Sequence, residues 1–233
     1  MTGPAFPPGS HIVVTGGDGA LGQAVVAAFV AAGAICHLPV LGAPAPGVVP
    51  GVNQTGGVNL TEEALVEAYY AGLPSPLAAS VHLAGGYRAG PIATTARADL
   101  DRMLELNLVT AFLCCREAAR AMRRGGGGGG GRIVNVGARV SEVPVGGAVA
   151  YSVSKAGVAA LTRSLAVELR PDGILVNAVL PSIIDTPANR AAMPTADFAR
   201  WPRPDDLART ILWLASPENR LTSGALIPVY GQA

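Results

Sequence analysis

The sequence predicts an α/β fold, in which a single domain is built around a doubly wound parallel sheet of the Rossmann-like type. Short apolar runs alternate along the chain with longer helical stretches, which implies right-handed crossovers and helices on both faces of the sheet. The short runs are almost continuously apolar, as expected of strands that are buried on both faces. Half of the 233 residues are hydrophobic, which is enough for one large core.

Seven apolar runs have the length and composition of strands. The predicted strands are residues 11–15, 34–38, 58–60, 80–84, 132–136, 174–179 and 225–229. The predicted helices are residues 21–32, 61–71, 97–124, 148–170 and 204–215. Thr61 is expected to cap the second helix, and residues 39–57, which are rich in Pro and Gly, are expected to form a loop.

Two segments are expected to lie outside the regular structure. Residues 1–10 are rich in Pro and Gly and lack the charged-then-apolar pattern of a signal peptide, so they predict a disordered N-terminal arm. The seven glycines at 125–131 predict a flexible connector between two core elements. Residues 11–233 are therefore expected to form one domain.

Composition excludes several classes of function. The net charge of +1 gives no reason to expect a nucleic-acid partner. No apolar run reaches the roughly 18 residues of a membrane span, and we expect a cytoplasmic protein. The odd number of cysteines argues against a disulfide framework. Cys114 and Cys115 are adjacent in an apolar helix and are expected to pack as small hydrophobic residues, so no metal site is predicted.

A glycine-rich turn follows the first predicted strand, with the sequence Thr-Gly-Gly-Asp-Gly-Ala-Leu-Gly over residues 15–22. Such a turn brings backbone N–H groups and a helix N-terminus to a pyrophosphate. Tight glycine turns also occur for structural reasons alone, but the strand–turn–helix context favours dinucleotide binding. The candidate binding residues here are Gly16, Asp18, Ala20, Leu21 and Gly22.

A tyrosine and a lysine are placed to act together. Tyr151 and Lys155 are four residues apart and share one face of a predicted helix. A nearby ammonium favours the phenolate and is expected to lower the pKa of Tyr151 from about 10 towards neutrality. Tyr151 would then be usable as a general acid or base. For the pair in isolation, the alternative is an exposed Tyr–Lys contact without function.

Taken together, these motifs resemble the short-chain dehydrogenase/reductase family along essentially the whole chain. The matching residues are the glycine turn, Ala84, Gly85 and Gly86 after the fourth strand, Asn107, Tyr151, Lys155, and Pro181 to Thr186. The resemblance implies an NAD(P)-dependent oxidoreductase that transfers a hydride between nicotinamide and a small carbonyl, alcohol or C=N substrate. It also implies assembly as a homodimer or homotetramer.

The resemblance implies a role for each matching residue. Tyr151 would exchange a proton with the substrate, and Lys155 would bind the nicotinamide ribose and tune Tyr151. Asn107 would hold a water in the proton relay; the alternative is an asparagine inside a helix that bonds backbone. Ile184 and Thr186, which follow Pro181, would orient the carboxamide of the cofactor. Residues 182–204, here named the cover segment, would cover the substrate.

The adenosine end departs from the family pattern. Related enzymes carry an acidic residue near Val40 for NAD or an arginine near Leu41 for NADP, and neither is present. Asp18 would repel an additional phosphate, so NAD is the expected cofactor and NADP the alternative. Asn59 replaces an aspartate that lies beside the adenine, and its amide oxygen can still accept a hydrogen bond from the adenine amino group.

The catalytic end lacks a serine. Family members place one thirteen residues before the tyrosine to donate a hydrogen bond to the substrate carbonyl, and this chain has Ala138 there. Losing such a donor costs roughly 10²- to 10³-fold in rate. Ser141 and Arg139 are the candidate replacements. Dihydropteridine reductases are locally similar, with alanine at this position and an Ala-Gly-Gly-aromatic turn like residues 84–87; their quinonoid pterin substrate needs no carbonyl-polarising serine.

Three kinds of function are compatible with this pattern. The first is the redox enzyme described above. The second is an enzyme of the same fold that uses Tyr151 for proton transfer or elimination without redox chemistry. The third is a binding or assembly protein that has lost activity. The departures that motivate the last are Ala20, Val40, Asn59 and Ala138.

Overall fold

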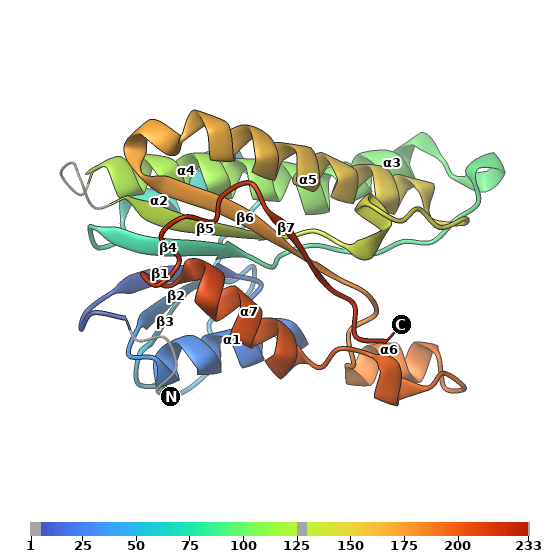
Figure 1. Ribbon diagram of the computed structural model, residues 1–233, viewed down its shortest axis with the longest axis horizontal. Coiled ribbons are helices and arrows are strands. Elements are labelled where there is room, and N and C mark those ends of the chain that lie inside the picture. The colour runs from blue at the N-terminus through green and yellow to red at the C-terminus, as the bar shows by residue number, and fades with distance from the viewer. Residues whose placement is uncertain (1–5, 125–129, 233) are drawn as a thin grey trace.

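The computed structural model describes residues 6–124 and 130–232, and it shows one seven-stranded parallel sheet with helices on both faces (Figure 1). The strand order is β3-β2-β1-β4-β5-β6-β7, so the order reverses between β1 and β4. This confirms the predicted doubly wound, single-domain α/β fold. Ligands of such sheets bind at the carboxyl ends of the strands, where the order reverses.

The elements follow the alternation that the sequence predicts. The strands are β1 (His11–Thr15), β2 (Ile35–Pro39), β3 (Val52–Thr55), β4 (Leu77–His82), β5 (Gly131–Val136), β6 (Ile174–Pro181) and β7 (Leu226–Val229). The α-helices are α1 (Ala20–Ala31), α2 (Glu63–Ala71), α3 (Arg97–Met103), α4 (Thr110–Arg124), α5 (Val149–Glu168), α6 (Pro187–Ala192) and α7 (Pro204–Ala215). The short helical turns are η1 (Ile92–Thr94), η3 (Arg139–Ser141), η4 (Arg170–Asp172) and η5 (Phe198–Arg200), and η2 (Leu104–Val109) is a π-helix.

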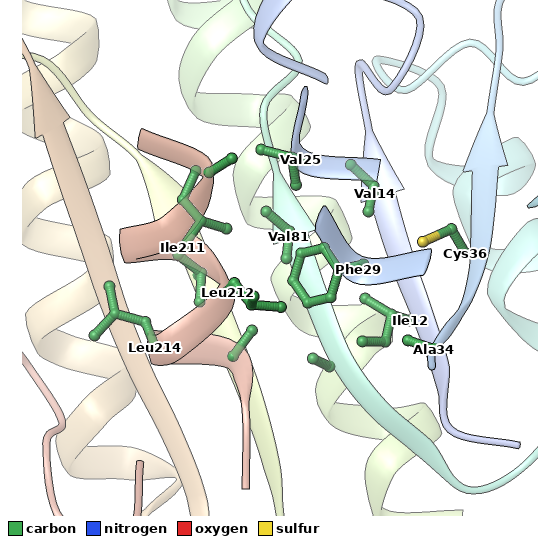
Figure 2. Close-up of a cluster of buried hydrophobic side chains, with 14 of the residues drawn as sticks. Ile12, Val14, Val25, Phe29, Ala34, Cys36, Val81, Ile211, Leu212 and Leu214 are labelled. Carbon is green, nitrogen blue, oxygen red and sulfur yellow. The ribbon is translucent and has the colours of Figure 1, made fainter. Parts of the chain in front are cut away.

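The helices form two layers around the sheet. α1 and α7 pack together on one face, and α2, α4 and α5 cover the other (Figure 1). Figure 2 shows the apolar cluster under α1 and α7, in which Phe29 and Ile211 meet Val14 and Val81 from the strands. α3, α6 and the C-terminus lie at one end of the molecule (Figure 1).

The predicted third strand is wrong. The strand lies at residues 52–55, inside the segment that we expected to be loop, and not at 58–60. β3 pairs in parallel with β2 at the edge of the sheet, and its residues alternate between half-buried and exposed. An edge strand of this kind needs no continuous apolar run, so the sequence Val-Asn-Gln-Thr gives little sign of it.

One further detail of the predicted elements is wrong, and another is refined by the structure. Thr61 does not cap the second helix, because the helix starts at Glu63 and the Thr61 hydroxyl instead bonds the Asn59 side chain. The long helix predicted over 97–124 is continuous but contains the π-helical segment η2 between α3 and α4. Such segments are frequent at functional sites.

The N-terminal residues are more ordered than predicted. Phe6 is buried against Phe29, with ring centroids 5.6 Å apart, and its N–H donates to the carbonyl of Ala32 at 3.0 Å. The predicted disorder of residues 1–10 is therefore wrong at residue 6. Residues 1–5 of that arm, and 125–129 of the predicted glycine connector, lie outside the described residues.

The three cysteines are buried, with free thiols. Burial raises the pKa of Cys114 to about 12, so this thiol is packed as an unreactive group. Within residues 6–124 and 130–232, no cluster of three or more His, Cys, Asp or Glu side chains could hold a metal ion. In the same residues, every helix is too short or too polar to cross a membrane.

Candidate active site

The glycine turn after β1 packs against the turn after β4. Gly16 has a positive φ of 64°, and a Cβ there would lie 2.9 Å from the backbone nitrogen of Ala84. The Thr15 hydroxyl accepts hydrogen bonds from the N–H groups of Leu83 and Ala84, both at 3.2 Å. A Cβ at Gly22 would collide with the carbonyl oxygen of Gly16. The chain therefore brings these two predicted segments together at the carboxyl edge of the sheet.

The start of α1 offers donors to an anion. Gly19 is the N-cap, and among the described residues no side chain caps this helix. The first N–H groups of a helix have no partner within it, so they are available to a phosphate. Asp18 and Ala20 are exposed beside them, and Leu21 is half-buried. The arrangement fits the pyrophosphate of a dinucleotide.

The positions that the family resemblance assigns to the adenosine end of the cofactor lie where β2 and β3 finish. Val40 is buried and its backbone bonds Thr55 and Val58, whereas Leu41 is exposed. Asn59 is already engaged: its amide oxygen accepts from the N–H of Thr61 at 3.2 Å and from the Thr61 hydroxyl at 3.0 Å. An adenine amino group would have to replace one of these bonds, so the acceptor role of Asn59 stays a prediction.

Lys155 is buried in the second turn of α5. Its Nζ donates to the carbonyl oxygen of Val136 at 2.9 Å, and a Cβ built on Gly85 would lie 3.5 Å from it. Burial lowers the pKa of Lys155 to about 8, because an ammonium is less stable away from water. Lys155 therefore joins α5 both to the end of β5 and to the turn after β4.

The pKa of Tyr151 moves in the opposite direction from our expectation. Burial of the phenol raises it to about 12, with a smaller contribution from the neighbouring Tyr87. The predicted lowering towards neutrality is thus wrong for the groups of the polypeptide alone. The physical reason is that Lys155 bonds Val136, so desolvation of the phenolate is the larger effect.

Asn107 links the turn after β4 to α5. Its oxygen accepts from the Gly86 N–H at 2.9 Å, and its nitrogen donates to the Gly86 carbonyl at 3.0 Å and to the Ser154 hydroxyl at 3.0 Å. Ser154 in turn donates to the carbonyl of Tyr151 at 2.8 Å. The side chain therefore does what we gave as the alternative, bonding of backbone, and the water-holding role stays a prediction.

Sequence reasoning missed two members of this arrangement. Ser154 lies three residues after Tyr151 on the same helix face, and this spacing was a usable signal. The carbonyl of Val136 could not have been identified, since every residue has one and only the approach of α5 to β5 selects it.

Ala138, which stands at the position of the missing serine, has little free space around it. Ala138 is buried in extended backbone after β5, at φ −160° and ψ 157°. The Ser141 hydroxyl donates to the Ala138 carbonyl at 2.6 Å, so its proton is in use. The Arg139 guanidinium lies over the ring of Tyr230, with its central carbon 5.3 Å from the ring centroid. Both candidate replacements are therefore engaged by other groups.

The segment after β6 is fixed by side chains of its own. Pro181 ends β6, the Ile184 carbonyl accepts from the Asn189 side chain at 2.8 Å, and the Thr186 hydroxyl accepts from the Asn189 N–H at 3.2 Å. Thr186 is thereby the N-cap of α6. Because its hydroxyl proton is not used in that bond, Thr186 can still donate a hydrogen bond to a carboxamide.

The cover segment holds α6 and η5 and borders a cavity of about 890 Å³. The cavity lies between this segment, the start of α7 and the chain end, and Tyr151 does not line it. Arg190 pairs with Asp185 at 2.5 and 2.8 Å, and Arg203 pairs with Asp206 at 3.4 Å. Both arginines are thus paired with carboxylates of the chain. This argues against a site here for an anionic group of the substrate.

Comparison with known proteins gives a consistent result. The profile of the family described as "Enoyl-(Acyl carrier protein) reductase" matches residues 20–231. Galactitol 2-dehydrogenase from Rhizobium johnstonii is 35% identical, over 95% of this chain and 93% of that protein. Carbonyl reductase [NADPH] 2 from Sus scrofa is 30% identical, over 94% of each chain.

Solved structures show the same similarity. A short-chain type dehydrogenase/reductase from Mycobacterium ulcerans has a TM-score of 0.86 and 25% identity, over 98% of this chain and 90% of that one. For two further curated relatives, 33% and 36% identical, the match spans 57% and 62% of the relative's length. The two relatives matched over 93% and 94% of their own length are named as a dehydrogenase and a reductase. The chain belongs to the short-chain dehydrogenase/reductase family.

Proposed function

We propose that this chain is an NAD-dependent oxidoreductase in which Tyr151 donates or accepts the proton that accompanies hydride transfer. The observation that carries the proposal is the convergence of three side chains at the carboxyl edge of β4 and β5. Lys155 bonds the end of β5, Asn107 bonds the turn after β4, and Ser154 connects Asn107 to the backbone of Tyr151. The substrate would be a small carbonyl, alcohol or C=N compound.

A dinucleotide would supply or accept the hydride when bound, and the residues of this chain would position it. Gly16, Gly22 and the uncapped start of α1 would hold the pyrophosphate. The Lys155 ammonium donates to the Val136 carbonyl, and it would exchange that partner for the nicotinamide ribose. A cation retained beside Tyr151 would then stabilise its phenolate and offset part of the effect of burial.

The cofactor preference follows from charge. Neither residues 38–42 nor residues 55–59, at the ends of β2 and β3, include an arginine or lysine that could bind a ribose phosphate. Asp18 is exposed on the glycine turn and would repel one. We therefore infer NAD as the cofactor. NADP is the alternative, since the name of the porcine relative includes NADPH.

Replacement of Tyr151 tests the proposed role directly. Tyr151→Phe should lower kcat by roughly 10²- to 10⁴-fold, because it removes the proton donor. The affinity for NADH, measured by calorimetry, should stay within about threefold of wild type, since the phenol makes no bond to the glycine turn. Val167→Ala, an exposed change at the other end of α5, is the control. Turnover retained in Tyr151→Phe would refute the assignment.

A substitution at Ala138 distinguishes the two types of substrate, ketones and conjugated C=N compounds. Ala138→Ser restores the donor that the family resemblance implies at this position, and for ketone substrates it should raise kcat by roughly 10- to 100-fold. For a conjugated C=N substrate, such as a quinonoid pterin, we expect a change of less than about threefold, since no carbonyl is polarised. Ala138→Gly is the control for size. An unchanged rate with ketones would show that the missing serine does not limit them.

Two other functions give different results in the same assays. A non-redox enzyme would convert substrate without a change in nicotinamide absorbance. A binding or assembly protein would show no turnover and no dinucleotide binding.

Assembly as a homodimer or homotetramer stays a prediction, supported by Phe112 and Val153, which are exposed on α4 and α5. Sedimentation velocity measures it.

A further inference from the structure

An exposed aromatic ring stands next to the catalytic tyrosine. Tyr87 follows directly after the Ala84-Gly85-Gly86 turn, and 68% of its surface is exposed. Its ring packs edge-to-face on the ring of Tyr151, with centroids 4.9 Å apart and an interplanar angle of 80°. Single exposed apolar residues are normal on protein surfaces, and it is the contact with Tyr151 that sets Tyr87 apart.

The backbone on both sides of Tyr87 is anchored. The N–H and carbonyl groups of Gly86 are both bonded by Asn107, at 2.9 and 3.0 Å. Three residues after Tyr87, the N–H of Gly90 donates to the carbonyl of Gly147 at 2.7 Å, just before α5 begins. The exposure of this ring is therefore set by the fold and does not reflect a loosely attached loop.

The two rings are also coupled electrostatically. After burial, the neighbouring Tyr87 is the second cause that raises the pKa of Tyr151. Tyr87 therefore shields the phenol of Tyr151 while most of its own surface stays open.

A substrate bound at the Tyr151 hydroxyl would lie close to Tyr87, because the two rings are in contact. The reacting oxygen or nitrogen would lie about 3 Å from the Tyr151 hydroxyl. Groups attached to the reacting carbon then extend over a ring whose centre is 4.9 Å from that of Tyr151. Aromatic rings attract one another in stacked or edge-to-face pairs by more than their buried area accounts for. A saturated ring of the same size lacks this contribution.

We infer that Tyr87 is a specificity-determining residue, whose ring forms a flat wall of the substrate site and selects compounds with a planar unsaturated ring beside the reacting C=O or C=N bond. The inference rests on the proposed function, since it takes Tyr151 as the group that meets the reacting atom. It names a substrate class, planar-ring ketones, alcohols or cyclic imines, to which neither the fold nor the family restricts the site.

A matched pair of substrates tests it. We would compare 1-phenylethanol with 1-cyclohexylethanol, using NAD, in wild type, Tyr87→Leu and Tyr87→Phe. Tyr87→Leu should raise KM for the phenyl alcohol by about three- to tenfold, with KM for the cyclohexyl alcohol and both kcat values within about twofold. Tyr87→Phe keeps the ring and should retain the preference. Trp213→Leu, which removes a partly exposed ring from α7, is the control.

A binding measurement separates this inference from the proposed function. Binding of acetophenone and of cyclohexyl methyl ketone to the same proteins can be followed by saturation-transfer NMR without any turnover. A phenyl preference that is lost in Tyr87→Leu supports the inference even if no alcohol is oxidised, in which case only the proposed function fails. A preference retained in Tyr87→Leu overturns the inference. Equal binding of both rings to wild type, or binding of neither, also overturns it.

Discussion

The two faces of the sheet are packed with different chemistry. Under α1 and α7, the centre of the core is an apolar cluster in which Phe29 meets Ile12, Val81 and Leu212 (Figure 2). Under α4 and α5, apolar packing is interrupted by a row of buried polar side chains. Alternation along the strands produces this split, since Ser80 and the other polar side chains point away from the apolar cluster.

The polar row is a continuous chain of hydrogen bonds. The Tyr70 and Ser80 hydroxyls lie 2.9 Å apart, Ser80 is 2.8 Å from Nε2 of His82, and Nδ1 of His82 is 2.8 Å from the oxygen of Asn135. Asn135 donates to Thr162 on α5 at 3.0 Å. A neutral imidazole with its proton on Nδ1 satisfies every member of this chain, as inferred from the partners.

The difference shows how one sheet supports both stability and chemistry. The polar row ends next to functional segments, since His82 precedes the turn after β4 and Asn135 precedes Val136, which holds Lys155. The apolar face also has functional neighbours, since Leu21, Val136 and Ile184 pack against its cluster, but what it contributes is the burial of apolar side chains. We therefore expect changes on the apolar face to alter stability at every pH, and changes on the polar face to alter its pH dependence.

The largest effect is expected on the apolar face. Phe29→Ala should lower the free energy of unfolding by about 3–5 kcal/mol, because it removes a fully buried ring and leaves a cavity. Urea denaturation at pH 5.5 and 7.5 should give the same loss. Val167→Ala, a change at an exposed position, should cost less than about 0.5 kcal/mol. A loss that differs between the two pH values would break the comparison.

Lys155 should give the next largest effect, with the opposite sign. Its folded pKa of about 8 lies below the unfolded value, so the buried ammonium destabilises the fold below pH 8. As pH rises from 8 towards 10.5, this penalty disappears. Lys155→Met should therefore raise the free energy of unfolding at pH 7 by about 2 kcal/mol, which is the shift less the lost bond to Val136.

Denaturation of both proteins at pH 7 and 9.5 measures this effect. The advantage of Lys155→Met should shrink at the higher pH, and turnover should be lost at both. A variant that is less stable than wild type at pH 7 would show that Lys155 contributes structure as well as chemistry.

The last effect concerns acid and appears as a slope of stability against pH. Burial lowers the pKa of His82 to about 4, so between pH 6.5 and 4 this imidazole binds a proton in the unfolded chain but not in the fold. The pKa of His37 is also lowered to about 4, which adds a second such proton. Stability is therefore lost as pH falls through this window. His82→Asn should flatten the slope by at most about 1.4 kcal/mol per pH unit, as seen by thermal denaturation at pH 4.5, 5.5 and 6.5. Phe29→Ala should keep the wild-type slope, and an unchanged slope in His82→Asn would contradict the assignment.

The sequence alone predicted most elements that are buried on both sides. β1 and α7 have the expected bounds, because a doubly buried strand is apolar throughout and Pro204 fixes the start of its helix. β3 was missed because an edge strand exposes every second residue. Propensity does not determine such a strand, and its pairing with β2 does.

The site was predicted to the same degree and for a similar reason. Tyr151 and Lys155 were predicted to share a helix face because helical spacing alone brings them there. Their roles follow from the family resemblance and stay predictions. The bond from Lys155 to Val136 and the bond from Ser141 to Ala138 were not predicted, since both depend on how distant segments approach. The predicted direction of the Tyr151 pKa shift was wrong for the same reason, because the burial of a side chain cannot be obtained from sequence spacing.

The most direct test of the account is calorimetric titration of the purified protein with NADH and with NADPH. The account predicts micromolar binding of NADH, about tenfold weaker binding of NADPH because of Asp18, and unchanged NADH binding in Tyr151→Phe. Absence of binding of either dinucleotide at millimolar concentration would contradict it. Tyr151 and Lys155 would then be remnants of a site that no longer acts on a nicotinamide cofactor.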